Sequence, residues 1–271
     1  MTLKIQNQTM IAYSVNRYQR NDKMIGKSIE KLSSGIKINR ANDNASGLAI
    51  SETMRAQMRG ISQAQRNMQD GLSVLQAADE GLSHVNGLLQ RARELSVMNA
   101  SDTLTHEDRQ ASQIELNQLM EAINDTADKL EFNTKKILGE NTPLELMVGS
   151  NPGQKITINL MDVSTEALDL QNVSLLTQEN AEQLIKKMDK AITTITGHLT
   201  KIGSYYEAVE HHIKNAIVFE SNLTTSISML KDTEMAKEMT HYTSLSIRQK
   251  GDQLLVAEVN NSVKEILNLL S

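Results

Sequence analysis

The longest regular pattern in the chain is a stripe of apolar side chains between residues 54 and 95. Gln65 is the one polar residue in register, and no proline interrupts the stripe. The members recur at intervals of three, four or seven residues, as one face of an α-helix requires: Met54, Met58, Ile61, Met68, Leu72, Leu75, Ala78, Leu82, Val85, Leu89, Ala92 and Leu95. This spacing predicts one helix about 60 Å long. Such a helix cannot bury its own stripe, so it needs long partner helices, as in a bundle.

Two further stretches supply these partners. After a turn at residues 99–103, Thr105 and Asp108 have the spacing of a capping box, with Asp in place of the usual Glu or Gln. The apolar spacing then predicts a second helix, which the short turn makes antiparallel to the first. Residues 185–230 carry a third stripe that matches the first in length.

The period changes between Leu144 and Leu160. Apolar residues alternate with polar ones on both sides of the Gly- and Pro-containing segment 149–153. Alternation around a turn signal predicts a β-hairpin. A connector then leads through Leu176 to the third long helix.

Both ends of the chain are predicted to be shorter amphipathic helices. Each interrupts its stripe with polar residues, at Asp22 in the N-terminal helix and from Ser246 to Gln253 in the C-terminal one. Helices this short are marginal alone in water, so their order should depend on partners. The apolar positions expected to form this pairing surface are Ile11, Val15, Tyr18, Ile25, Ile29, Leu32, Val256, Val259, Val263, Ile266 and Leu270.

Composition supports a thin helical fold. Aromatic residues make up 3% of the chain and Trp and Cys are absent, so cores must be built from aliphatic side chains and Met, without disulfides. Residues 1–8 lack the apolar run of a cleavable signal peptide, and no window approaches a membrane span. An exported protein of this kind would need a dedicated export route.

Charge is unevenly distributed. Residues 1–40 contain eight Lys and Arg against Asp22 and Glu30, a net charge of +6 within a chain of −5. Such a basic segment is compatible with a membrane surface or a nucleic acid. A solvated or partner-facing helix face is favoured instead, because the charges are dispersed and aromatic residues are scarce. We therefore expect neither nucleic acid nor membrane insertion.

No arrangement of residues predicts catalysis, a metal site or a cofactor. His106 lacks the second His of a zinc-protease helix. Glu207 and His211 share a helix face, but no third ligand is indicated. The glycines of the first long helix follow no strand, so they are not a phosphate loop. Close approach of neighbouring helices is the better interpretation of these glycines, which are Gly60, Gly71, Gly81 and Gly87.

Several segments together form a sequence signature. The longest is EKLSSGIKINRANDNASGLAIS at residues 30–51. Others are QDG at 69–71, QAADEGL at 76–82, LQRARELSV at 89–97, EFNTKKIL at 131–138, DTEMAKEM at 232–239 and ILNLL at 266–270. These segments resemble bacterial flagellin, the filament subunit of the flagellum. The sequence departs from the family at Thr134, where Gly is common, and at residues 244–264, where charged residues and Gly251 replace Ala- and Gln-rich sequence.

The resemblance implies a mainly α fold: a long antiparallel coiled-coil rod with a small β-hairpin region, and terminal helices paired as a coiled coil. Its implied segments are a polymerisation helix at 1–34, a connector at 35–47, the N-terminal half of the rod at 48–139, the hairpin and connector at 140–177, the C-terminal rod helix at 178–230, and a second polymerisation helix at 231–271.

The implied function is mechanical. A flagellin is exported through the flagellar secretion channel and polymerises with copies of itself into an extracellular filament used for motility. Its implied partners are a chaperone, the export apparatus, and the cap and hook-filament junction proteins. Two alternatives are disfavoured: a chemoreceptor-like signalling rod by the hairpin and the short end helices, and a hydrolytic enzyme by the lack of a nucleophile, base or metal set.

The resemblance also implies an exposed patch for the animal Toll-like receptor 5. The matching positions are Gln90, Arg91, Arg93, Glu94, Leu95 and Glu115. Leu95 belongs to the packing stripe as well, and Arg91 is equally suited to contacts within a filament. Recognition by this receptor is therefore an expectation that the family resemblance alone supports.

Overall fold

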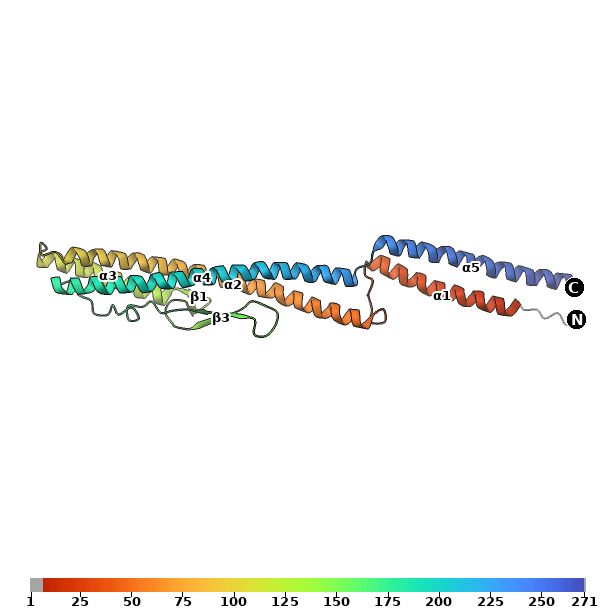
Figure 1. Cartoon of the computed structure of the whole chain (residues 1–271), viewed down its shortest axis with the longest axis horizontal. Helices are drawn as coiled ribbons and strands as arrows, with labels where there is room; N and C mark the ends of the chain where they lie inside the picture. The colour runs from red at the N-terminus through yellow and green to blue at the C-terminus, as the bar shows by residue number, and fades with distance from the viewer. Residues whose placement is uncertain (1–6, 271) are drawn as a thin grey trace. The chain divides into compact units, whose positions relative to one another are not determined.

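The protein is described by a computed structural model that covers residues 7–270; the side chains of residues 7, 8, 10, 259, 260 and 262–270 lie outside the description. Helices make up 73% of the chain, which confirms the mainly α class. The elements are α1 (Asn7–Ser34), α2 (Ala45–Asn99), α3 (His106–Lys129), β1 (Glu131–Phe132), β2 (Lys135–Lys136), β3 (Pro143–Met147), β4 (Lys155–Asn159), α4 (Gln178–Lys231) and α5 (Met235–Leu270) (Figure 1).

The chain divides into two compact units. We call residues 57–221 the central unit, and residues 1–56 with 222–271 the terminal unit. Each unit has its own internal packing.

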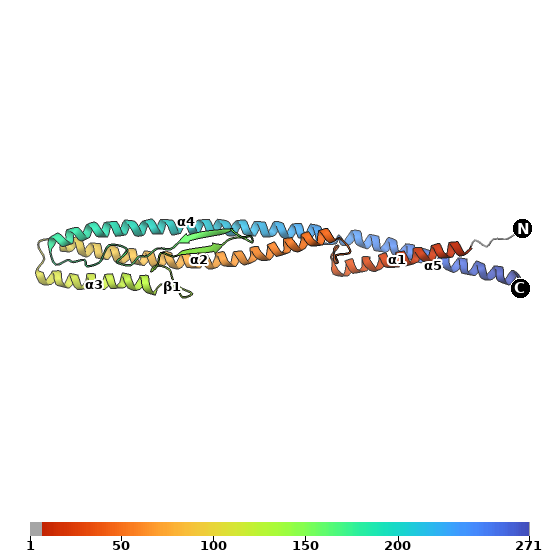
Figure 2. The same ribbon diagram turned by 90° about the horizontal axis from the view of Figure 1, so that it is seen from below.

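The central unit is built on α2, with α3 and α4 alongside it (Figure 2). Hydrogen bonds from Gln65 to Glu220 (2.9 Å) and from Arg93 to Asp189 (2.6 Å) show that α2 and α4 are antiparallel. The predicted stripe faces inward, since Met68, Leu75 and Leu82 have no exposed surface. The sequence prediction of one long helix with long partners is thus confirmed.

The capping box at the start of α3 is confirmed. Asp108 N–H donates to the Thr105 hydroxyl (3.3 Å), and Thr105 N–H donates to the Asp108 carboxylate (3.1 Å). The two residues therefore satisfy backbone donors that the first helical turn would otherwise leave unpaired.

The predicted hairpin is formed by β3 and β4, which pair antiparallel with Leu144 opposite Ile158 and Leu146 opposite Ile156. Leu146 and Ile158 are buried in the core. A second ribbon, β1–β2, was not predicted. It turns through Asn133 (φ 49°) and Thr134 (φ 67°), the left-handed pair of a tight two-residue hairpin.

The connector after the hairpin contributes to the core, which the sequence did not indicate. Val163, Leu170 and Leu175 are at most 1% exposed. The Gln113 side chain of α3 accepts a hydrogen bond from Leu175 N–H (2.6 Å) and donates one to the Val173 carbonyl (3.3 Å). These bonds hold the connector against α3.

The four glycines of α2 that the sequence analysis singled out behave differently from the prediction. A Cβ at Gly60, Gly71 or Gly81 would meet Ser150, Leu146 or Leu130, respectively, each within 2.8 Å. These neighbours lie in the segment that includes the hairpin and the end of α3, so the close approach is mainly to β and loop structure. At Gly87 there is no neighbour within 4 Å among the described residues, so close approach does not explain it.

In the terminal unit, α1 and α5 pair with each other, and their linkers pair as well. Lys37 N–H donates to the Lys231 carbonyl (2.6 Å), and Thr233 N–H donates to the Gly35 carbonyl (2.8 Å), around a bridge between Ile36 and Asp232. Gly35 ends α1 with φ 70°, the usual conformation after a helix C-terminus.

Candidate assembly and recognition surfaces

The contact between α1 and α5 is antiparallel. Along α1 from Ser28 to Tyr18, the hydrogen-bond partners advance along α5 from Glu238 to Gln253. Ser28 donates to Glu238 (2.6 Å) and Gln253 donates to the Tyr18 hydroxyl (3.4 Å). Paired terminal helices are therefore present within one subunit, as the fold prediction required.

Six of the predicted pairing residues are half-buried between these helices or beside them: Ile11, Val15, Tyr18, Ile25, Leu32 and Val256. Ile29 differs, because its side chain is 48% exposed. The side chains of Val259, Val263, Ile266 and Leu270 lie outside the described residues.

The inward face of α1 is shifted from the predicted one. Asn21 (8% exposed) and Ser28 (2%) point inward, while Asp22 and Ile29 are exposed. Positions 21, 25, 28 and 32 keep helical spacing as well as 22, 25, 29 and 32 do. The sequence analysis chose the second set because Ile29 is apolar. The structure turns the first set inward, and Ser28 of that set donates a hydrogen bond to Glu238.

Several large apolar side chains of the terminal unit are exposed in the single subunit, and sequence reasoning did not select them. They are Tyr13 (66%), Met24 (40%), Ile50 (47%), Met229 (82%), Met235 (50%), Met239 (54%), Ile247 (65%), Leu254 (72%) and Leu255 (51%). One signal was available at residues 254–256, where three consecutive apolar residues cannot all face one helical neighbour. These side chains are available for contacts with other molecules.

In the central unit, Arg91 joins two carboxylates on the surface. Its guanidinium lies 2.8 Å from Glu115 of α3 and 3.1 Å from Glu94 of α2. The hydrogen bond to Glu115, followed by the one to Glu94, raises the pKa of Arg91 above its ordinary value. The cluster therefore remains charged, and it spans two helices.

The other predicted patch residues are not all part of this cluster. Arg93 points toward α4 and pairs with Asp189 (2.6 Å), and Gln90 is exposed. Leu95 is only 2% exposed and packs in the core, because it belongs to the inward stripe of α2. The Leu95 side chain is therefore not part of the exposed surface formed by the other predicted patch residues.

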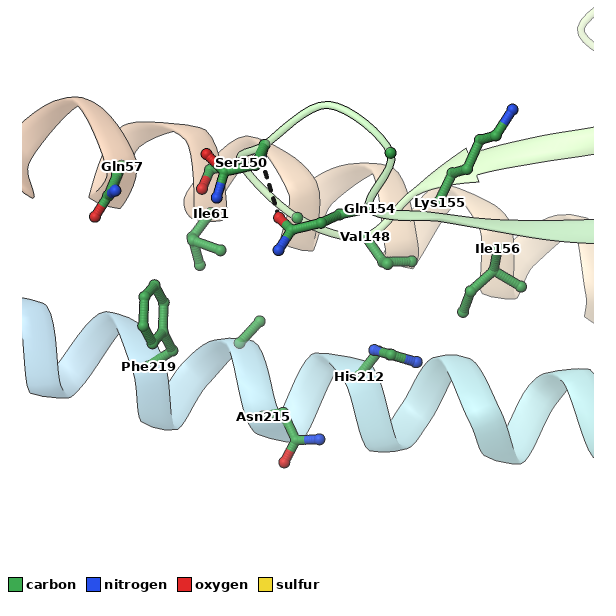
Figure 3. A pocket seen from close by; sticks show the side chains of 14 residues that line it. Gln57, Ile61, Val148, Ser150, Gln154, Lys155, Ile156, His212, Asn215 and Phe219 are labelled. Atoms are coloured by element: carbon green, nitrogen blue, oxygen red, sulfur yellow. Dashed lines mark hydrogen bonds between the residues drawn. The ribbon is translucent and has the colours of Figure 1, made fainter.

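A recess of about 510 Å³ lies between the hairpin turn, α2 and α4 (Figure 3). Gln154 shapes the turn by accepting a hydrogen bond from Asn151 N–H (3.0 Å). Ile61, Val148, Ile156 and Phe219 give the recess apolar walls, and His212 is the one histidine among its lining residues. The lining contains no paired acid and base, so the recess offers packing surface rather than acid–base chemistry.

The remaining chemistry-bearing residues do not converge. Glu207, His211 and His212 are exposed on α4. In the part of the chain that the structure describes, no three His, Asp or Glu side chains are grouped closely enough to hold a metal. Within the same residues, none of the helices combines the length and apolarity needed to cross a membrane.

Comparison with known families covers most of the chain. The family described as bacterial flagellin N-terminal helical region matches residues 5–142, and the bacterial flagellin C-terminal helical region matches residues 185–270. The chain is 38% identical to a flagellin of Halalkalibacterium halodurans, over 90% of this chain and 91% of that one. It is 33% identical to a flagellin of Bacillus subtilis, over 99% and 100% of the two chains.

Solved structures agree with this result. The crystal structure of Bacillus cereus flagellin superimposes with a TM-score of 0.52 and 27% identity, over 56% of this chain and 88% of that one. A putative flagellar hook-associated protein from Vibrio parahaemolyticus gives a TM-score of 0.59 at 13% identity, over 70% of this chain and 99% of that one, which shows a shared fold only.

Proposed function

The chain belongs to the bacterial flagellin family, and from this premise we propose that its two terminal helices assemble it, copy by copy, into a helical filament. Flagellins are structural subunits of the extracellular flagellar filament, so the chain is a filament protein and not an enzyme. Identical subunits form a fibre when one surface of each meets a different surface of the next without closing a ring.

The observation that carries the proposal is the exposed apolar surface of the terminal unit. Leu254, Ile247 and Tyr13 are each more than 60% exposed although their helices are already paired. The outward Ile29 adds to this surface. Burial of such side chains against neighbouring subunits yields roughly 25 cal/mol per Å², which offsets the cost of ordering the chain ends.

The predicted segments receive their roles from this proposal. Residues 1–34 and 231–271 form the inner layer of the filament, and residues 35–47 connect the first of them to the rest. The intervening segments, 48–139, 140–177 and 178–230, form the outer part. All residues of the main buried cluster lie between Ile61 and Ala216, which supports a core independent of assembly.

The assembly test compares two exposed apolar side chains. Leu254→Ser removes one from α5, and Met147→Ser removes one (39% exposed) from the hairpin, which we place outside the polymerisation surface. Neither change should unfold the subunit. We expect the first to raise the critical concentration for filament growth severalfold, measured by sedimentation and electron microscopy, and the second to leave it unchanged. Equal critical concentrations for Leu254→Ser and the parent would contradict the proposal.

Export and assembly partners follow from the same proposal. The subunit leaves the cell through the flagellar secretion channel. A chaperone shields its exposed C-terminal helix, and the cap and hook-filament junction proteins bind the growing polymer. Copurification of the subunit with a chaperone, lost on deletion of residues 231–271, tests this part.

We further propose that the free subunit is recognised by Toll-like receptor 5. The charged cluster of Arg91, Glu94 and Glu115 supports this, because it is exposed and spans two rigid helices. Gln90 and Arg93 lie beside this cluster, while the buried Leu95 side chain packs in the core beneath it. In a reporter-cell assay, Arg91→Ala should weaken signalling and Arg66→Ala, an exposed arginine elsewhere on α2, should not. Equal signalling by the two variants would argue against recognition through this cluster.

A further inference from the structure

Polar residues of α1 and α5 meet each other in the contact between the two helices. Asn21 of α1 donates to Asp252 of α5 (2.7 Å), and Arg17 lies 2.9 Å from the other oxygen of the same carboxylate. Asp252 is 1% exposed and Asn21 is 8% exposed. We call Arg17, Asn21 and Asp252 the polar layer.

Further contacts within and between the two helices surround the polar layer. The Arg17 guanidinium lies 5.9 Å from the centre of the Tyr13 ring, within cation–π range. Gln249 donates to Asp22 (3.0 Å), and Gln253 donates to Tyr18 on the flank. A buried carboxylate is costly unless it is paired and hydrogen-bonded. Here Asn21 donates the hydrogen bond to one oxygen and Arg17 supplies the positive charge beside the other, which accepts no hydrogen bond from the described residues.

A slip of the two helices by one heptad would break this pairing while keeping the stripes in contact. Asp252 would then move from Asn21 to Ser14 or Ser28, and Met10 or Met24 would stand where Arg17 is now. Asn21 would face Leu245 or Val259, neither of which has a polar side chain. Both slipped pairings therefore leave the Asn21 amide without its acceptor and place a serine opposite the carboxylate. The cation one turn away would then lie on the other side of that serine, Arg17 after Ser14 or Lys31 after Ser28.

We propose that the polar layer determines the register in which α1 and α5 pair. A single buried polar position is known to fix register in coiled coils at some cost in stability. This proposal rests on the proposed assembly function. If all subunits pair α1 and α5 in one register, each presents the same outer surface of the paired helices to its neighbours.

The test maps register with cysteines in a chain that has none of its own. Tyr18→Cys is combined with Gln253→Cys to report the native register, or with Ser246→Cys or Asn260→Cys to report slips of one heptad. One heptad is about 10 Å along a helix, so a thiol cross-linker of shorter reach separates the cases. Mixed isotope-labelled subunits distinguish links within a subunit from links between subunits.

Three backgrounds carry these cysteine pairs. Asn21→Leu with Asp252→Leu removes the buried amide and carboxylate and leaves an apolar seam. Asn21→Asp with Asp252→Asn exchanges the two groups and keeps Arg17 one turn from the new carboxylate. Glu258→Leu, which removes an exposed carboxylate from the same helix, is the matched control.

We expect native links to dominate in the parent, the exchanged variant and the Glu258→Leu control. In the leucine variant the ratio of native to slipped links should fall at least about tenfold, the effect of losing one buried hydrogen bond. An unchanged ratio in the leucine variant would show that other residues set the register and would overturn the proposal.

Assembly is scored separately by electron microscopy. If the parent forms no filaments, the proposed function fails, whereas the link ratio still decides the register. If the leucine variant fails to assemble, the single change Asn21→Asp is tested instead, because it places a second carboxylate directly opposite that of Asp252. This single change should abolish native links and filaments, and adding Asp252→Asn should restore both. Failure of that restoration would also overturn the proposal.

Discussion

Thr134 occupies a backbone conformation that suits glycine. Its φ of 67° lies in the left-handed region, which costs a residue with a β-carbon about 1 to 2 kcal/mol. We predict that Thr134→Gly raises the free energy of unfolding by about 1 kcal/mol, after the greater flexibility of Gly in the unfolded chain is subtracted. Chemical denaturation measures this change. Thr134→Ala, which keeps the β-carbon, should gain less, and an equal gain would refute the explanation.

Two glycines of α2 offer a matched comparison. A Cβ at Gly81 would lie 2.5 Å from Leu130 and 2.8 Å from Leu138, and the latter is buried. Gly81→Ala should therefore lower stability by about 1 to 3 kcal/mol through overpacking. Gly87 has open space around it, so Gly87→Ala should raise stability by up to about 1 kcal/mol. Thermal unfolding of both variants checks this, and changes of the same sign would contradict it.

At the scale of elements, the start of α3 responds to pH through its capping box. The hydrogen bond from the Thr105 hydroxyl, and then that from the Thr105 backbone, lowers the pKa of Asp108. A lowered folded-state pKa contributes stability above the unfolded value of about 3.9, and this stability is lost as the pH falls through the folded value. We predict that the difference in Tm between the parent and Asp108→Ala shrinks between pH 7 and about pH 3. A pH-independent difference would indicate that the charge of Asp108 is unimportant.

The hairpin is expected to tolerate a longer turn. Asn151 and Gly153 are exposed, whereas Ser150 touches α2 beside Gly60. Insertion of a Gly/Ser segment after Asn151 should leave both the fold and filament growth intact, because exposed loop tips accept insertions. Circular dichroism and electron microscopy test the two parts. Loss of filaments by a folded variant would place the hairpin at an essential subunit contact.

Element type was well predicted where one period dominated a long segment. The stripe of α2 and the Thr105–Asp108 box specify local structure directly, and both were confirmed. The β1–β2 ribbon was missed because each strand has two residues and Thr134 hides the usual glycine signal. The buried connector was missed because Leu170 and Leu175 follow no period, so only tertiary packing shows where they lie.

The terminal surface was harder to predict than the helices that carry it. Two sets of positions on α1 satisfy the same spacing, and the partner helix decides between Asn21 and Asp22. The spacing of residues within one helix does not show which helix packs against it or in which register. For the same reason, the sequence analysis placed the interruption of the α1 stripe at Asp22, whereas Asn21 and Arg17 are the residues that meet Asp252 in the polar layer.

At the scale of the whole molecule, we predict different stabilities for the two units. Residues 1–34 and 231–271 should exchange backbone hydrogens rapidly in the free subunit and slowly in the filament, because their helices keep large apolar side chains exposed until neighbouring subunits cover them. The core between Ile61 and Ala216 should be protected in both states. Hydrogen exchange with mass spectrometry measures this. Strong protection of the ends in the free subunit would contradict the prediction.

Deletion of either end should leave a folded helical subunit that does not polymerise.

The exposed side chains of the terminal unit also have a consequence for oxidative chemistry. Met24, Met229, Met235 and Met239 are 40 to 82% exposed in the single subunit, and the chain has no cysteine to react first. Oxidation to the sulfoxide turns such a flexible apolar side chain into a polar one. A free subunit that meets an oxidant would thus carry polar groups on the surface that we propose to be buried on assembly, while a subunit already inside a filament would be shielded by its neighbours.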